Sequence, residues 1–258
     1  MLRDIAEVEG DTDAFIDTYQ GHDLMNPHFV SEIAMQLLQA GRAEEALDDL
    51  DRAQPSEQNR HFGQHRWTEA RIAALDAVQR TGEAPALRLA FFQTHLSPSH
   101  LRAYLRRLPD FEDFEAEQRA LDYVAGSANV HAALAFLVEW PAHERAARLV
   151  LLRINEIDGD RYELLDPAAA TLEGKYPLAA VLLRRALIEV TLRKGRATRY
   201  KHAARHVREI DSLNSQIKDY EKFETYEQFM ERLRKMHPRK TGFWPLLHDR
   251  NSSRTFDS

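Results

Sequence analysis

Residues 176–192 read YPLAAVLLRRALIEVTL, and this segment decides the fold class of the chain. Its apolar residues recur at the spacing of one helical face. They are Leu178, Val181, Leu182, Leu187, Ile188 and Leu192. A basic turn follows at 193–196, and residues 200–217 predict a further helix. Such helices are too apolar on one side to be stable alone, so the segment predicts packing against neighbouring helices.

The clearest repeat lies at residues 27–53. Its pattern, LLxAGRxEEALxxL at 37–50, resembles the tetratricopeptide repeat (TPR), a helical hairpin of about 34 residues. In such a hairpin Gly41 permits a tight turn, and the small Ala46 lets the two helices approach closely. Later segments keep no strict period, so we expect a degenerate array.

Periodic apolar residues, separated by Gly or Pro breaks, predict helices along the rest of the chain. The predicted helices are His28–Gln39, Ala43–Ala53, Trp67–Arg80, Glu83–His95, Pro98–Leu108, Phe111–Ala125, Val130–Trp140, Ala142–Ile157, Tyr162–Leu172, Tyr176–Leu192, Tyr200–Ile217 and Tyr226–Met236. We therefore predict an all-α fold, an α-solenoid of stacked antiparallel helical hairpins that is TPR-like with degenerate repeats. The predicted domains are an acidic lead helix at 1–26, the helical-repeat domain at 27–248 and a disordered tail at 249–258.

Composition excludes several classes of protein. The chain has no cysteine, which excludes disulfides and thiolate metal sites. No apolar run approaches the roughly 18 residues of a membrane span. The acidic, interrupted start at residues 1–7 does not resemble a signal peptide. We expect a cytoplasmic protein with no membrane partner.

Charge is unevenly distributed, although the net charge is −6. Residues 1–60 hold 14 acidic and 4 basic side chains, whereas residues 175–208 hold 10 basic side chains and the single acid Glu189. Such asymmetry is typical of chains with an anionic partner, and equally of helices that pair their charges with neighbours. Arg184 and Arg185, inside the apolar helix, fit the second interpretation.

The residues that we predict to bind a partner lie in the basic segment and beside it. They are Arg193, Lys194, Arg196, Arg199, Tyr200, Lys201, His202, Arg205, His206 and Trp244. Trp244 belongs to segment 239–245, which we expect to fold back over the open end of the last hairpin, because a terminal repeat needs a cap.

Two His-x-x-x-His pairs, His61/His65 and His202/His206, have the helical spacing of a bidentate metal grip. Neither has glutamate after its first histidine, so the zinc-protease motif is absent, and surface or hydrogen-bonded histidines explain both pairs. No nucleophile motif and no glycine-rich phosphate loop is present. We predict no catalytic residues, no bound metal and no cofactor.

Several segments together resemble a known family. They are AGRAEEAL at 40–47, LRAYLRRLPDF at 101–111, YPLAA at 176–180, RYKHAARH at 199–206 and KTGFW at 240–244. The chain is similar over residues 28–244 to an uncharacterised, mostly proteobacterial domain-of-unknown-function family, whose members are often longer at the amino end. A weaker likeness is to the helical tail of SWIM-type zinc-finger proteins, without the finger. The resemblance implies a TPR-like α-solenoid, no established activity and no site residues.

We predict a non-enzymatic scaffold whose concave surface binds a peptide or protein partner. The alternative is a nucleic-acid or polyanion binder that uses the basic segment 184–208. A third hypothesis is a metal-binding protein or enzyme around the His202/His206 pair.

Overall fold

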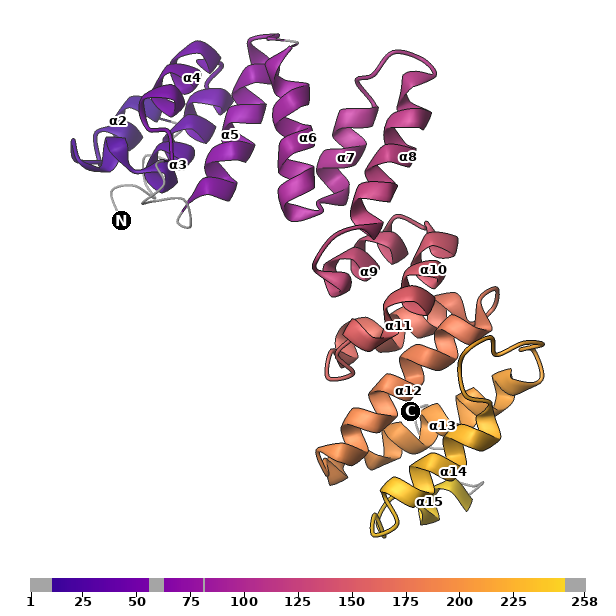
Figure 1. The fold of residues 1–258 in the computed structure, drawn as a ribbon. Coiled ribbons are helices and arrows are strands. Elements are labelled where there is room, and N and C mark those ends of the chain that lie inside the picture. Colours follow the sequence, from indigo (N-terminus) through magenta and orange to yellow (C-terminus); the bar gives the residue numbers. More distant parts are fainter. Residues whose placement is uncertain (1–10, 56–62, 81, 249–258) are drawn as a thin grey trace, which may run out of the picture. The chain divides into compact units, whose positions relative to one another are not determined.

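The computed structural model describes residues 11–55, 63–80 and 82–248, and this part of the chain is entirely helical (Figure 1). The described residues form 14 α-helices and no strand, and 72% of them are helical. The predicted all-α fold class is confirmed. The predicted tail at 249–258 and the first residues of the predicted lead helix lie outside the described residues.

The chain divides into two compact units, Met1–Phe114 and Glu115–Ser258. The first unit contains α2 (Thr12–Ile16), α3 (Pro27–Gln39), α4 (Ala43–Arg52), α5 (Gln64–Ala77), α6 (Glu83–His95) and α7 (Pro98–Leu105). Helix α8 (Glu112–Ala125) begins in the last residues of the first unit and continues into the second. The second unit also contains α9 (Val130–Glu139), α10 (His143–Arg153), α11 (Tyr162–Leu172), α12 (Pro177–Arg193), α13 (Tyr200–Asn214), α14 (Tyr226–Met236) and α15 (Pro245–His248).

Helix α3 is the centre of the first unit, where it packs against α2, α4 and α5. The predicted hairpin of α3 and α4 is present, with Gly41 at φ +75° in its turn. Ala34 and Ala46 are both completely buried, and their small side chains leave room for the two helices to approach. Helix α4 also contacts α5, so the second hairpin, α5 with α6, packs against the first.

Helix α12 is the centre of the second unit, where it contacts α10, α11 and α13. The sequence predicted one apolar face, but the structure buries this helix on nearly all sides. From Ala179 to Leu192 every residue is buried except Ala186 and Glu189, which are partly buried. The three neighbouring helices also cover the faces of α12 that its apolar periodicity predicted to be exposed to solvent. The buried set includes the charged residues Arg184 and Arg185.

A close backbone approach positions the connection between α10 and α11 on α12. A Cβ atom at Gly159 would lie 2.1 Å from the carbonyl oxygen of Ala186. Only glycine permits this contact, because backbone atoms of a packed helix cannot move aside. The connection turns at Gly159 and Asp160, where the backbone N–H of Asp160 donates to Asp158 Oδ1 over 3.0 Å.

The segment after α14 folds back onto α13. Phe243 is completely buried, and its ring centroid lies 5.9 Å from that of Tyr200 on α13. The indole N–H of Trp244 donates to the carbonyl of His237 over 2.9 Å. These contacts cover α13, which α15 also contacts.

Several helices end earlier than the periodicity predicted. The helix predicted to reach Arg80 ends at Ala77, and Gln79 adopts a φ of 57° that a helix does not allow. The helices predicted to reach Leu108 and Ile217 end at Leu105 and Asn214. Apolar periodicity continues through a terminal turn, so it does not locate the last residue of a helix. None of the described helices has both the length and the apolar character that crossing a bilayer requires.

We predict that Gly159→Ala lowers the free energy of unfolding by about 2 kcal/mol, because the new methyl group collides with the backbone of α12. The measurement is the midpoint of urea unfolding followed by circular dichroism. Gly174→Ala is the matched control in the same unit, because a Cβ there would meet no atom within 4 Å. Equal midpoints for the two variants would contradict the close approach.

Candidate functional site

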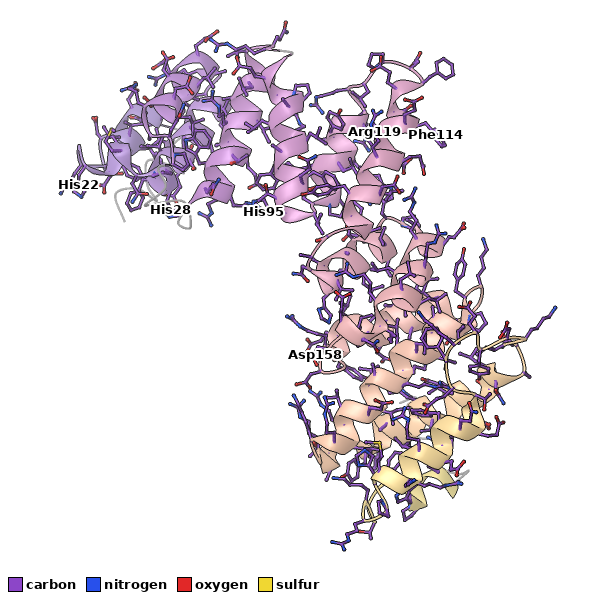
Figure 2. The ribbon with its side chains drawn as sticks, in the orientation of Figure 1. His22, His28, His95, Phe114, Arg119 and Asp158 are labelled. Atoms are coloured by element: carbon purple, nitrogen blue, oxygen red, sulfur yellow. The ribbon has the colours of Figure 1, made fainter. Side chains whose placement is uncertain are left out.

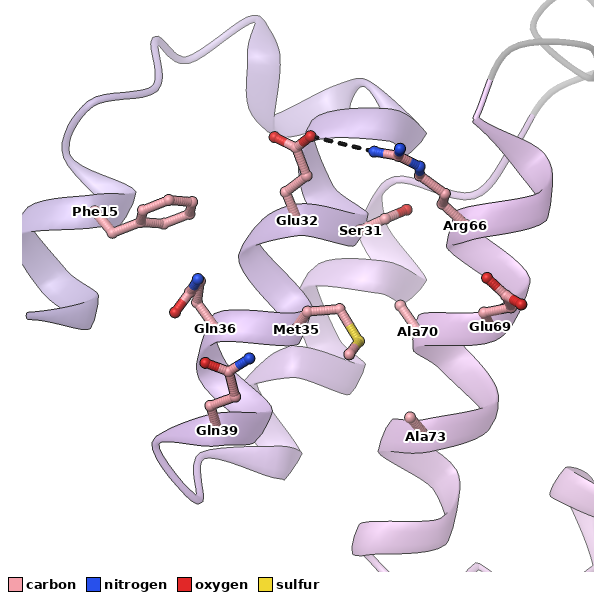
Figure 3. A pocket seen from close by; sticks show the side chains of 10 residues that line it. All are labelled: Phe15, Ser31, Glu32, Met35, Gln36, Gln39, Arg66, Glu69, Ala70 and Ala73. Atoms are coloured by element: carbon pink, nitrogen blue, oxygen red, sulfur yellow. Dashed lines mark ion pairs between the residues drawn. The ribbon is translucent and has the colours of Figure 1, made fainter. Parts of the chain in front are cut away.

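A groove lies between α3 and α5 in the first unit (Figure 3). Its volume is about 660 Å³, and the lining residues come mainly from these two helices, with Phe15 of α2 at one end. We call this feature the α3–α5 groove. The two helices are the first members of successive hairpins, so the groove follows from how one hairpin packs against the next.

Helical spacing brings the lining residues onto facing surfaces. On α3, Met35 and Gln39 are four residues apart and therefore lie on one face, and on α5 the same holds approximately for Arg66, Ala70 and Ala73. Figure 3 shows the Met35 side chain extending towards Ala70, which is 1% exposed. The two alanines and the methionine provide an apolar surface within the groove.

Charged side chains lie at one end of the groove. Glu32 Oε1 lies 3.5 Å from a guanidinium nitrogen of Arg66, which joins α3 to α5 (Figure 3). Glu32 also accepts a hydrogen bond from the Tyr19 hydroxyl over 2.9 Å. The Ser31 hydroxyl donates to the carbonyl of Pro27 in its own helix, so it is not poised as a nucleophile.

The amide groups of Gln36 and Gln39 differ from these paired groups. Neither side chain makes a hydrogen bond to another described residue, and both line the groove. Met35 beside them is 44% exposed. A carboxamide offers both donors and an acceptor, which is the hydrogen-bonding complement of a peptide main chain. The groove therefore combines an apolar surface with donors and acceptors that match those of a peptide main chain.

The basic segment that the sequence singled out lies in the second unit, and much of its charge is paired there. Lys194 Nζ lies 2.8 Å from Asp160 Oδ2, and Arg196 forms two hydrogen bonds to the same carboxylate. Arg199 lies 3.5 Å from Asp160. The hydrogen bonds from Lys194 and Arg196 hold the pKa of Asp160 below its ordinary value. One carboxylate thus serves three of the predicted binding residues.

Arg205 and His206 belong to a second set of ion pairs. Arg205 Nη2 lies 2.8 Å from Asp166 Oδ2, and Nδ1 of the buried His206 lies 2.9 Å from Glu209 Oε2. Arg184, 3% exposed, donates to the same Glu209 oxygen over 2.8 Å and also to Glu173. We call these residues the Glu209 network.

The pKa of Glu209 reflects this surrounding. Burial by itself raises the pKa, but the hydrogen bonds from His206 and Arg184 outweigh burial and lower it to about 2. The carboxylate therefore stays charged over the whole neutral range and neutralises a guanidinium that has almost no contact with water.

The remaining predicted binding residues do not converge on one place. Tyr200 is buried against Phe243, and Trp244 packs at the end of the second unit. Arg193, Lys201 and His202 are exposed. No single cleft contains all ten predicted residues.

The two members of the His202/His206 pair have different surroundings. His202 is exposed, whereas His206 is buried and contacts acids. Ligand atoms of Asp166, His206 and Glu209 lie within 4.8 Å of one another, but Arg184 and Arg205 already bind the two carboxylates. This set resembles an ion-pair network more than a metal site.

The other pair is only partly described. His61 lies outside the described residues. The ring centroid of His65 is 4.7 Å from that of Phe91, and its Nδ1 is 3.3 Å from Glu69 Oε2. These contacts are those of an exposed helix histidine that lies beside an acid and an aromatic ring.

Comparison with known protein families assigns the chain to one of them. The sequence model described as "Family of unknown function (DUF6880)" matches residues 1–246. The chain belongs to the DUF6880 family. No curated protein matches it, and no solved structure does. The DUF6880 match spans nearly the full length of both compact units.

Sequence reasoning missed the groove residues of this DUF6880 chain. Gln36 and Gln39 were not singled out, because polar residues off the apolar stripe of a helix normally face solvent. The helical position of Met35 was the available signal. It is an apolar residue outside the buried stripe of α3, on the side where the next hairpin packs.

We predict that Glu209→Gln lowers the stability of the folded protein at pH 7, on the order of 2–3 kcal/mol, because it leaves Arg184 short of a counter-ion. The folded-state pKa lies below the ordinary value of 4.5, at about 2, so this contribution is present above pH 4.5. It is lost as the pH falls towards 2.

Urea unfolding at several pH values tests this expectation. The difference between the wild type and Glu209→Gln should be largest at neutral pH and should shrink below pH 4.5. Glu231→Gln, at an exposed position of α14, is the control with the same change of charge. A difference that does not depend on pH would contradict the role of the Glu209 charge.

Proposed function

We propose that this chain is a non-enzymatic helical-repeat scaffold that binds an extended peptide segment of a protein partner in the α3–α5 groove. The observation that carries the proposal is the pair of carboxamides, Gln36 and Gln39, which have no hydrogen bond to any other described residue and lie beside an apolar surface. Polar groups of this kind fix the orientation of a ligand, and the apolar surface contributes affinity.

The repeat arrangement is part of the proposal. Helix α3 contacts both its partner in the hairpin, α4, and the first helix of the next hairpin, α5. In a TPR-like α-solenoid each hairpin packs against the next one in this way. We assign the α3–α5 groove to the concave face of that array in the first unit, because curved repeat proteins bind their partners on this face.

The dimensions and chemistry of the groove fit an extended peptide. Its volume of about 660 Å³ is that of a binding pocket for a few side chains. The main chain of the peptide would exchange hydrogen bonds with Gln36 and Gln39, and an apolar side chain would cover Met35, Ala70 and Ala73. Glu69 at the rim favours a peptide that carries a basic residue.

Much of the charge in the basic segment is already paired within the second unit. This favours the α3–α5 groove, rather than the basic segment, as the principal binding surface. A polyanion would have to compete with Asp160 and Asp166 for Lys194, Arg196 and Arg205, and breaking such pairs costs part of the binding energy. A peptide that binds beside Gln36 and Gln39 would not have to break an ion pair of either side chain.

We predict that the double variant Gln36→Ala/Gln39→Ala weakens the binding of groove ligands by roughly tenfold or more, because each lost hydrogen bond contributes about 0.5–1.5 kcal/mol. The measurement starts with selection of peptides from a random library displayed on phage, against the wild-type chain. Dissociation constants of the selected peptides are then measured by fluorescence anisotropy for both proteins.

Gln54→Ala provides the matched control, because Gln54 is exposed and lies outside the groove. It should leave the dissociation constants unchanged. A library that yields no binding peptide, or peptides that bind the double variant as tightly as the wild type, would overturn the proposal.

A further inference from the structure

A second cavity lies in the second unit, well separated in sequence from the α3–α5 groove. The connection at 154–159, helix α12 and the segment 222–224 line it, together with Arg232 of α14. Its volume is about 530 Å³. Asp158, labelled in Figure 2, and Arg185 of α12 are among its lining residues. We call it the Arg185 pocket.

Arg185 is a buried cation whose charge no acid contacts directly. Its side chain is 5% exposed, and its one hydrogen bond goes from Nη1 to the neutral backbone carbonyl of Glu224 over 2.8 Å. The Nε and Nη2 atoms are buried and have no hydrogen-bond partner among the described residues. The guanidinium carbon lies 4.6 Å from the ring centroid of Phe229, which stabilises the cation without neutralising it.

The glutamates in the pocket wall are already occupied by another arginine. Arg232 Nη2 lies 2.7 Å from Glu189 Oε1, and its Nε lies 2.8 Å from Glu224 Oε1. These two acids and Arg232 form a closed group with good geometry, in which two carboxylates share one guanidinium. Neither carboxylate accepts a hydrogen bond from Arg185.

Two further cations in the lining are exposed and unpaired. Arg193 at the end of α12 and Lys222 after α13 form no ion pair with any described residue. The lining holds four cationic and three acidic side chains, although the chain as a whole carries a net charge of −6. The pocket is therefore a local positive region on an acidic protein, with one cation held where the dielectric constant is low.

We propose that the Arg185 pocket binds a phosphate monoester. A phosphate group carries up to two negative charges and three acceptor oxygens, so it matches cations that reach it from different elements. Arg193 and Lys222 would contact its oxygens, the amide of Asn155 would add a neutral donor, and the buried charge of Arg185 would attract it through the pocket wall. A carboxylate has fewer acceptor oxygens and less charge, and so fits these cations less completely.

The phosphate monoester can belong to a small molecule or to a phosphorylated side chain of a peptide. The recognising chemistry is the same for both. The experiment therefore uses O-phosphoserine as the free ligand and a short phosphoserine peptide as the second, each with its unphosphorylated counterpart. Isothermal titration calorimetry of the full chain at low ionic strength measures the four dissociation constants.

The test variant is Arg193→Gln/Lys222→Gln, because both side chains are exposed and their replacement leaves the core intact. The expected result is binding of at least one phosphorylated ligand by the wild type, weakened about tenfold or more in the variant. The unphosphorylated ligands should not bind. Arg148→Gln/Lys235→Gln, at exposed positions outside the pocket, makes the same change in net charge and should leave binding unchanged.

A second readout reports on Arg185 itself without replacing it. In protein labelled with ¹⁵N-arginine, a buried Nε–H group gives its own signal, and a phosphate in the pocket should shift the Arg185 signal in the wild type. A preference for the free ligand or for the peptide identifies the source of the phosphate. No binding of either phosphorylated ligand, or equal weakening in the control variant, would overturn the proposal.

Discussion

Burial of α12 on nearly all sides is the constraint on which the second unit depends. This 17-residue helix contacts α10, α11 and α13, so a charge on its buried part needs a partner inside the protein. Arg184 and Arg185 follow one another in the helix and meet this need in different ways. Arg184 pairs with Glu173 and Glu209, whereas Arg185 packs on Phe229 and donates to a carbonyl. The first solution produces the Glu209 network, and the second leaves a positive pocket.

The polar groups of the two units differ in whether they have partners within the protein. In the second unit most charged groups near α12 are paired, and this pairing fixes the connections between helices. In the first unit, Gln36 and Gln39 have no hydrogen-bonding partner among the described residues and lie beside the exposed Met35. Solvent-exposed polar groups without a protein partner contribute little to folding, and they are available to a ligand. We therefore place the proposed peptide site in the first unit.

The sequence predicted the helices well, because apolar periodicity with Gly and Pro breaks is a local signal. Glu83–His95, Tyr162–Leu172 and Tyr226–Met236 have the predicted bounds. It did not predict that α12 is buried on nearly all sides, since periodicity cannot show how many neighbours a helix has. It also could not show that Asp160 pairs with Lys194 and Arg196, because residues more than 30 positions apart are brought together only by packing. The basic segment thus looked like a binding surface, whereas Gln36 and Gln39 looked like ordinary solvent-facing residues.

Native-state hydrogen exchange tests the central position of α12 most directly. If α12 is the core of the second unit, the amides of Leu182, Leu183, Leu187 and Ile188 exchange only when the whole unit unfolds. Their free energies of opening should then equal the free energy of unfolding of that unit, and should exceed those of α14, which has an exposed face. Exchange of these four amides through local opening, as fast as that of α14, would contradict the account.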